Sequence, residues 1–141
     1  MVPKLDSAYM SHSAQVRKDW KDDPLCHDTG TFEGMTGMFQ RAADLDALGH
    51  GKVVDGLSNE IGCPVWIGHG SGDKVTSFPA SERVFGELVV KETGDKTFKN
   101  FEGAYHKLHA EPDGVGEEFA KEVGEWIVKH ASQGDHTKPK L

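Results

Sequence analysis

This 141-residue sequence contains an aspartate and a histidine that could act together, with the histidine as a general base. Asp73 lies in a glycine-rich turn, and His106 lies in a later loop. A carboxylate that accepts a hydrogen bond from an imidazole fixes its tautomer and leaves the other ring nitrogen free to take up a proton. The residue types alone leave a plain alternative open, because aspartates are common in glycine turns and single loop histidines are usually solvated.

Each of these residues follows a segment that predicts a β-strand. Residues 64–68, PVWIG, form a short apolar run, which is typical of a strand buried on both faces in a parallel sheet. Residues 96–101 alternate in character and predict a second strand. Neighbouring strands lie about 4.8 Å apart, and function gathers at the carboxyl ends of parallel strands. We therefore expect Asp73 and His106 to meet at one edge of the sheet.

Helical patterns surround the two strands. Ser77 is a predicted N-cap of a helix through about Lys91, with Val84, Phe85, Leu88 and Val89 facing inward. Residues 115–131 predict a strongly amphipathic helix. The order strand, helix, strand, helix predicts a βαβα unit with parallel strands, and hence an α/β fold. Shorter helices are expected earlier, over residues 12–20, 32–45 and 52–61.

Two motifs resemble those of the monoacylglycerol lipases, which are serine hydrolases of the alpha/beta-hydrolase fold. The sequence CPVWIGHGSGD, residues 63–73, is similar to the family's seventh strand and acid turn. The sequence EGAYHKLHAE, residues 102–111, closely resembles its catalytic-histidine loop, and residues 23–25, DPL, resemble the point where the cap returns to the core. The resemblance runs from about Val16 to His130. It implies that Asp73 is the acid and His106 the base of a Ser-Asp-His triad, in the family's chain order.

The resemblance also implies a division of the chain into parts of a partial alpha/beta-hydrolase fold. Residues 1–30 correspond to the end of the cap, 31–62 to a helical segment linking the cap to the core, 63–132 to the C-terminal core, and 133–141 to a polar tail. The family's nucleophile lies in a G-x-S-x-G turn before the cap, and no such pattern occurs in these 141 residues. We therefore predict that the chain hydrolyses no esters alone and pairs with a missing N-terminal half.

A row of large apolar residues lies at helical spacing in the segment before the first strand: Phe32, Met35, Met38 and Phe39. The pattern predicts a face packed on the sheet. The resemblance adds a share in an acyl-chain groove beneath the cap, where flexible methionines adapt to lipid tails. It implies a small lipid ester as the substrate of the full-length parent, peripheral membrane contact through the cap, and no cofactor.

The composition of the chain excludes some classes of partner and location. The 16 basic residues against 23 acidic ones give a net charge of −7, which argues against a nucleic-acid partner. No stretch approaches the roughly 18 apolar residues of a membrane span. Two cysteines fit a reducing compartment, so we expect a cytoplasmic protein, with lipid association as a further expectation.

Two other hypotheses compete with the hydrolase. One is a noncatalytic interaction module, or a degenerate paralogue, that keeps the fold for binding a partner. The other is a metal protein that uses His106, His109 and Glu111, which form an H-x-x-H pattern followed by a carboxylate. Zinc ligands usually lie at helical spacing or in paired cysteines, so we predict no metal here.

Overall fold

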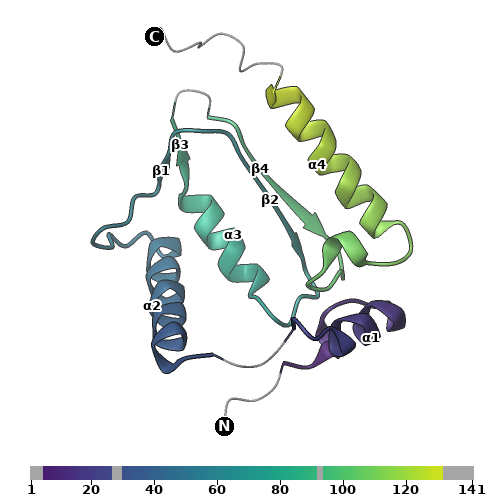
Figure 1. Ribbon diagram of the computed structural model, residues 1–141. Helices are drawn as coiled ribbons and strands as arrows, with labels where there is room; N and C mark the ends of the chain where they lie inside the picture. The colour runs from purple at the N-terminus through teal and green to yellow at the C-terminus, as the bar shows by residue number, and fades with distance from the viewer. Residues whose placement is uncertain (1–4, 27–29, 92–93, 132–141) are drawn as a thin grey trace, which may run out of the picture.

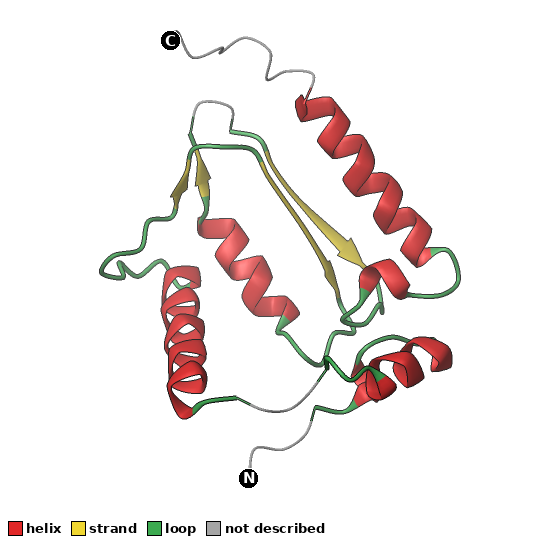
Figure 2. Ribbon diagram, viewed as in Figure 1, coloured by secondary structure: helices red, strands yellow, loops and turns green. Residues whose placement is uncertain are grey.

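The computed structural model describes residues 5–26, 30–91 and 94–131, and the predicted tail at 133–141 lies outside them. The chain forms an α/β arrangement with helices on both sides of a two-stranded parallel sheet (Figures 1 and 2). Its elements follow in the order η1 (Ser7–Tyr9), α1 (Ala14–Asp22), α2 (Phe32–Gly49), β1 (Glu60–Ile61), β2 (Val65–Gly70), α3 (Phe78–Glu87), β3 (Val89–Val90), β4 (Lys96–Phe101), η2 (Leu108–Ala110) and α4 (Val115–Ala131).

The predicted parallel pair is confirmed. Strand β2 pairs with β4 in parallel over six residues, from Val65 opposite Lys96 to Gly70 opposite Phe101. Both strands therefore end at the same edge, from which the two candidate loops leave. A shorter parallel pair, β1 with β3, lies at the other end of the sheet (Figure 1). Within the described residues β2 pairs only with β4, so its other edge is open.

The two faces of the sheet receive different helices, because successive side chains of a strand point to opposite faces. Phe98 packs edge-on against Phe78 and also contacts Phe85, both from α3. On the other face, Trp66 and Phe101 contact Phe119 of α4. The most buried cluster lies on this second face, directly under the histidine loop, and contains Phe101, Ala104 and Leu108.

Helices α1, α2 and α3 each begin after a residue whose side chain caps the helix. Ser13, Thr31 and Ser77 each accept a hydrogen bond from a backbone N–H in the first turn of the helix that follows. The N-cap predicted at Ser77 and the helix over 115–131 are confirmed, and the helix expected over 32–45 extends to Gly49. None of the helices in the described residues is long and apolar enough to cross a lipid bilayer.

Two helical predictions are wrong, and strand pairing explains both. Residues 52–59 contain no helix, and Glu60–Ile61 forms β1 instead. Helix α3 ends at Glu87 rather than near Lys91, because Val89 leaves the helix to donate its N–H to the Asn59 carbonyl. Val89 is consequently half-exposed in β3 rather than buried in a helix. Lys96 then caps the end of α3, since its Nζ donates to three carbonyl oxygens there.

Candidate active site

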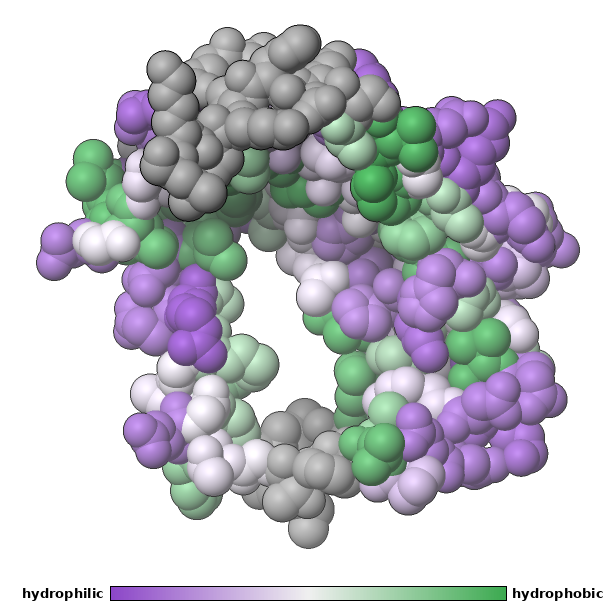
Figure 3. Space-filling model, turned by 45° about the horizontal axis from the view of Figure 1, so that its top comes forward, coloured by the Kyte–Doolittle hydropathy of each residue, from purple (hydrophilic) through white to green (hydrophobic). Residues whose placement is uncertain are grey.

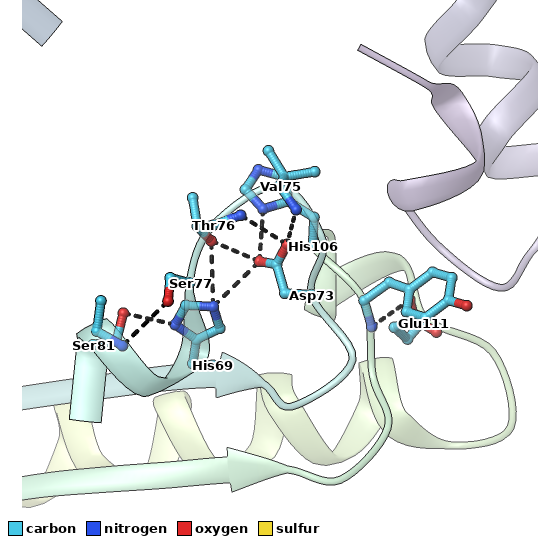
Figure 4. A network of polar contacts seen from close by, with 10 residues as sticks. His69, Asp73, Val75, Thr76, Ser77, Ser81, His106 and Glu111 are labelled. Carbon is cyan, nitrogen blue, oxygen red and sulfur yellow. Dashed lines mark hydrogen bonds and ion pairs between the residues drawn. The ribbon is translucent and has the colours of Figure 1, made fainter. Parts of the chain in front are cut away.

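Asp73 and His106 meet at the carboxyl edge of the sheet, as predicted. The Nδ1 atom of His106 lies 3.0 Å from Oδ2 of Asp73 (Figure 4). Because a carboxylate can only accept, Nδ1 carries the proton of this hydrogen bond and Nε2 is the free basic nitrogen. The Asp73 side chain is 3% exposed and that of His106 is 37% exposed. Within the described residues, Nε2 has no hydrogen-bond partner. The buried carboxylate thus holds a base that faces outward.

The acid loop folds around the Asp73 carboxylate. Its Oδ1 accepts the backbone N–H groups of Val75 and Thr76 at 2.7 and 3.0 Å, and its Oδ2 accepts the Thr76 hydroxyl at 2.7 Å. Burial by itself raises the pKa of Asp73, but the hydrogen bonds from His106 and Thr76, and from the two N–H groups, outweigh it and lower the pKa to about 2. Asp73 is therefore an anion throughout the pH range in which an imidazole acts as a base.

The glycines of the acid turn bring the two loops together. A Cβ on Gly70 or on Gly72 would overlap the backbone of residues 103–105. With hydrogen atoms in place of side chains, the Gly72 N–H donates to the Ala104 carbonyl at 3.0 Å, and Ser71 Oγ accepts the Gly103 N–H at 2.7 Å. The close approach is what allows Asp73 to reach His106.

A second buried carboxylate braces the histidine loop from behind. The Glu111 side chain is 2% exposed and accepts the Tyr105 N–H at 3.1 Å, directly before His106. Its Oε2 also lies 2.8 Å from Nδ1 of His12, which comes from the N-terminal segment. The Lys107 N–H donates to the Met10 carbonyl at 2.8 Å. These contacts tie the histidine loop to residues about one hundred positions earlier in the chain.

A third polar side chain reaches the acid from the sheet. His69, the penultimate residue of strand β2, is buried, and its Nε2 lies 3.3 Å from Oδ2 of Asp73. Neither His69 nor Thr76 was among the predicted site residues. A signal for Thr76 was present: an Asp followed three residues later by Thr is a spacing that favours local side-chain to backbone hydrogen bonds.

An apolar groove lies beside the acid loop, between α2 and the β2–α3 segment. Helices α2 and α3 touch near Gly49 and Val84, where Arg83 also pairs with Asp46, and they diverge toward the site (Figure 1). The groove has a volume of about 500 Å³. Figure 3 shows an opening in the molecule with hydrophobic surface along its rim.

The four residues predicted to bind the acyl chain do not all reach this groove. Met38 and Phe39 line it, together with Ile67, Val75 and other residues of α2 and α3. Phe32 and Met35 are not among its lining residues, and Phe32 is 90% exposed at the start of α2. The predicted packing of this face on the sheet is wrong, because α2 packs chiefly against α3 and leaves Phe32, Met38 and Phe39 more than half exposed.

The three residues of the metal hypothesis do not converge. His106 faces Asp73, whereas Glu111 turns to His12 and to the backbone of the loop. His109 lies in η2. Within the described residues, no group of three His, Cys, Asp or Glu side chains has the arrangement of a metal site.

Comparison with known proteins gives related hydrolases. A protein of Schizosaccharomyces pombe named "Putative monoglyceride lipase" is 26% identical over 134 residues, covering 95% of this chain and 32% of that protein. Caffeoylshikimate esterase of Arabidopsis thaliana is 39% identical over 69 residues, covering 48% of this chain and 20% of the esterase.

A crystal structure of Paleococcus ferrophilus monoacylglycerol lipase superposes with a TM-score of 0.70 at 32% identity, covering 89% of this chain and 44% of the lipase. The chain therefore spans about a third of the curated lipase it matches and less than half of the solved one. Residues 1–113 match the family model described as serine aminopeptidase, S33. The match takes in both loops of the site, and the chain accordingly belongs to this family of alpha/beta hydrolases and is related to the monoglyceride lipases.

Proposed function

We propose that this chain supplies the acid and the base of a serine ester hydrolase of the monoacylglycerol-lipase type. The observation that carries the proposal is the 3.0 Å contact between His106 Nδ1 and the buried Asp73 carboxylate. The nucleophilic serine and its oxyanion donors belong to a part of the enzyme that these 141 residues do not include. The family model is described as a peptidase family, and the names of the relatives support an ester as the substrate.

In the proposed mechanism, Asp73 holds His106 in place and His106 carries the proton. Asp73 holds the Nδ1–H tautomer of His106, so Nε2 removes the proton of the attacking serine hydroxyl. The resulting imidazolium is stabilised by the adjacent anion, and Nε2–H then protonates the leaving alkoxide. Water repeats the sequence on the acyl-enzyme, again with His106 as the base. Because the Asp73 carboxylate already accepts four other hydrogen bonds or close contacts, it does not reorient during these transfers.

The groove beside the acid loop supports a lipid ester as the substrate. It is lined largely by apolar side chains, among them Met38 and Phe39 of α2. A solved monoglyceride lipase of Saccharomyces cerevisiae, 23% identical and sharing the fold with a TM-score of 0.76 over 92% of this chain and 43% of that one, was crystallised with a substrate analog. We assign the groove to one acyl chain, and the exposed apolar residues of α2 to contact with a lipid surface in the cytoplasm.

A chimera tests the proposed function. The chain replaces the part of the Paleococcus lipase on which it superposes, so that the rest of that enzyme supplies the serine. We expect hydrolysis of a monoacylglycerol, with a loss on the order of 10⁴-fold in kcat for His106→Ala and for Asp73→Asn. Glu125→Gln, an exposed change on α4, is the matched control and should retain activity.

Two results would contradict the proposal. One is a chimera whose activity survives His106→Ala. The other is ester turnover by the 141-residue chain alone that resists a serine-directed fluorophosphonate yet disappears in His106→Ala, because the dyad would then act without a serine.

A further inference from the structure

A second histidine stands on the opposite side of the acid from His106. The Nδ1 atom of His69 lies 2.9 Å from the Ser81 hydroxyl, and its Nε2 lies 3.2 Å from Thr76 Oγ1 (Figure 4). The His69 side chain is 10% exposed and packs edge-on against the Phe78 ring. Every polar atom of this imidazole is therefore committed to a group that also belongs to the acid loop or to α3.

The proton positions in this cluster follow from the acceptors. The single hydroxyl proton of Thr76 goes to the Asp73 carboxylate, because that contact is 2.7 Å and the anion can only accept. Thr76 Oγ1 can then only accept from His69, so Nε2 of His69 carries a proton. In a neutral imidazole Nδ1 is bare, and it accepts the Ser81 hydroxyl. The result is one directed chain from Ser81 through His69 and Thr76 to Asp73.

We infer that His69 is a positioning residue that sets the orientation of the Asp73 carboxylate toward His106, an inference that rests on the proposed function. The His69 Nε2–H fixes the rotation of the Thr76 hydroxyl and contributes a close N–H to Asp73 Oδ2 at 3.3 Å. Oδ2 is the same oxygen that His106 uses. Without His69, the Thr76 hydroxyl loses the donor that fixes its rotation, and Oδ2 loses a close N–H. The two backbone N–H groups on Oδ1 then hold only one oxygen of the carboxylate, and Oδ2, the oxygen that His106 uses, is less firmly placed.

The structure supplies a pair of variants that separates positioning from mere filling of space. His69→Gln can place its amide N–H where Nε2–H stands, and so preserves the donor to Thr76. His69→Leu fills a similar volume but removes the donor. The matched control is His130→Leu, since His130 also has a side chain that is 10% exposed and pairs with an aspartate, Asp95, at the far end of β4.

The first measurement uses the 141-residue chain and needs no activity. Nitrogen-15-labelled histidine reports the exchange-protected Nδ1–H of His106 as a downfield proton resonance. We expect this resonance in the native chain, in His69→Gln and in His130→Leu, and we expect it to be lost in His69→Leu although the variant keeps its helical circular dichroism. A resonance that persists in His69→Leu would overturn the inference.

The second measurement uses the chimera. We expect His69→Leu to lower kcat on the order of 10- to 100-fold with little change in KM, and His69→Gln to recover most of the loss, since misplacement of a catalytic group by about 1 Å costs up to about 100-fold. Equal losses of kcat in both variants, or a change in KM alone, would mean that His69 only fills space, and would contradict the inference. A chimera that is inactive with native His69 would refute the proposed function instead, while the resonance still decides the role of His69.

Discussion

Replacing Asp73 with asparagine should remove a contribution to stability that depends on pH. The pKa of Asp73 is lowered from 3.8 to about 2 in the folded chain, where the carboxylate is 3% exposed. At about 1.4 kcal/mol for each tenfold change in proton affinity, the folded state gains about 2.5 kcal/mol from ionised Asp73. Because the folded pKa is the lower one, this gain is complete above the unfolded pKa and disappears as the pH falls toward 2.

The assay is the free energy of unfolding in urea, measured between pH 7 and pH 2 for the native chain, for Asp73→Asn and for the exposed control Glu125→Gln. The difference between native and Asp73→Asn should be larger by about 2 kcal/mol at pH 7 than near pH 2, and about half of that excess should remain at pH 3. Other acid-sensitive groups affect both proteins and cancel in the difference. Glu125→Gln should track the native chain at every pH.

A direct titration checks the same reasoning independently. The carboxyl carbon resonance of Asp73 should move with a midpoint near pH 2, well below that of an ordinary aspartate near 3.9. A midpoint near 4, or an Asp73→Asn difference that is constant from pH 7 to pH 2, would refute the idea that the hydrogen bonds around Asp73 outweigh its burial.

Three further changes test the parts of the fold that hold the site. Gly70→Ala should lower the free energy of unfolding in urea by about 3 kcal/mol, because the added Cβ overlaps the Ala104 carbonyl. The control Gly124→Ala, whose Cβ meets open space on α4, should raise it by about 0.5–1 kcal/mol. Equal effects would show that the two loops can move apart. Lys96→Met should cost about 1–3 kcal/mol in the same assay by leaving three carbonyls of α3 without their ammonium donor, and no loss would mean that water replaces it. In sedimentation velocity, the 141-residue chain should self-associate through the open edge of β2 and the apolar groove, and the variant Phe39→Lys should self-associate less. A monodisperse monomer would contradict this and favour the independent binding module.

The elements that position the site were predictable because their signals are local. Residues 64–68 form a continuous apolar run, and residues 115–131 carry one apolar stripe at helical spacing, so the first pattern indicates a buried strand and the second an amphipathic helix. The segment 52–61 lacks such a signal. Its Glu60–Ile61 pairing with Val89–Val90 joins strands that are far apart in sequence, and this pairing decides the structure of both segments. Helical periodicity cannot report a partner that lies elsewhere in the chain.

Some contacts of the site were likewise predictable from the sequence, and others were not. Asp73 and His106 were predictable because parallel strands deliver their C-terminal loops to one edge, so the meeting follows from topology. The brace between Glu111 and His12 spans 99 positions, and no spacing rule connects them. For Glu111, the sequence suggested only a metal ligand, because a carboxylate beside an H-x-x-H pattern resembles one when its real partner is unknown.

The brace also explains how a chain that matches less than half of a solved lipase can present an ordered base. Four residues in the described part of the chain orient His106 and its neighbours. Asp73 fixes the ring, the Tyr9 carbonyl accepts the His106 N–H, Glu111 accepts the N–H of the residue before, and the Met10 carbonyl accepts the N–H of the residue after. None of these bonds requires a nucleophile or an oxyanion hole. The pair of Asp73 and His106 is therefore preorganised within the described residues. Under the proposed function, a serine-bearing part would need to supply only the nucleophile, its oxyanion donors and a strand to cover the open edge of β2.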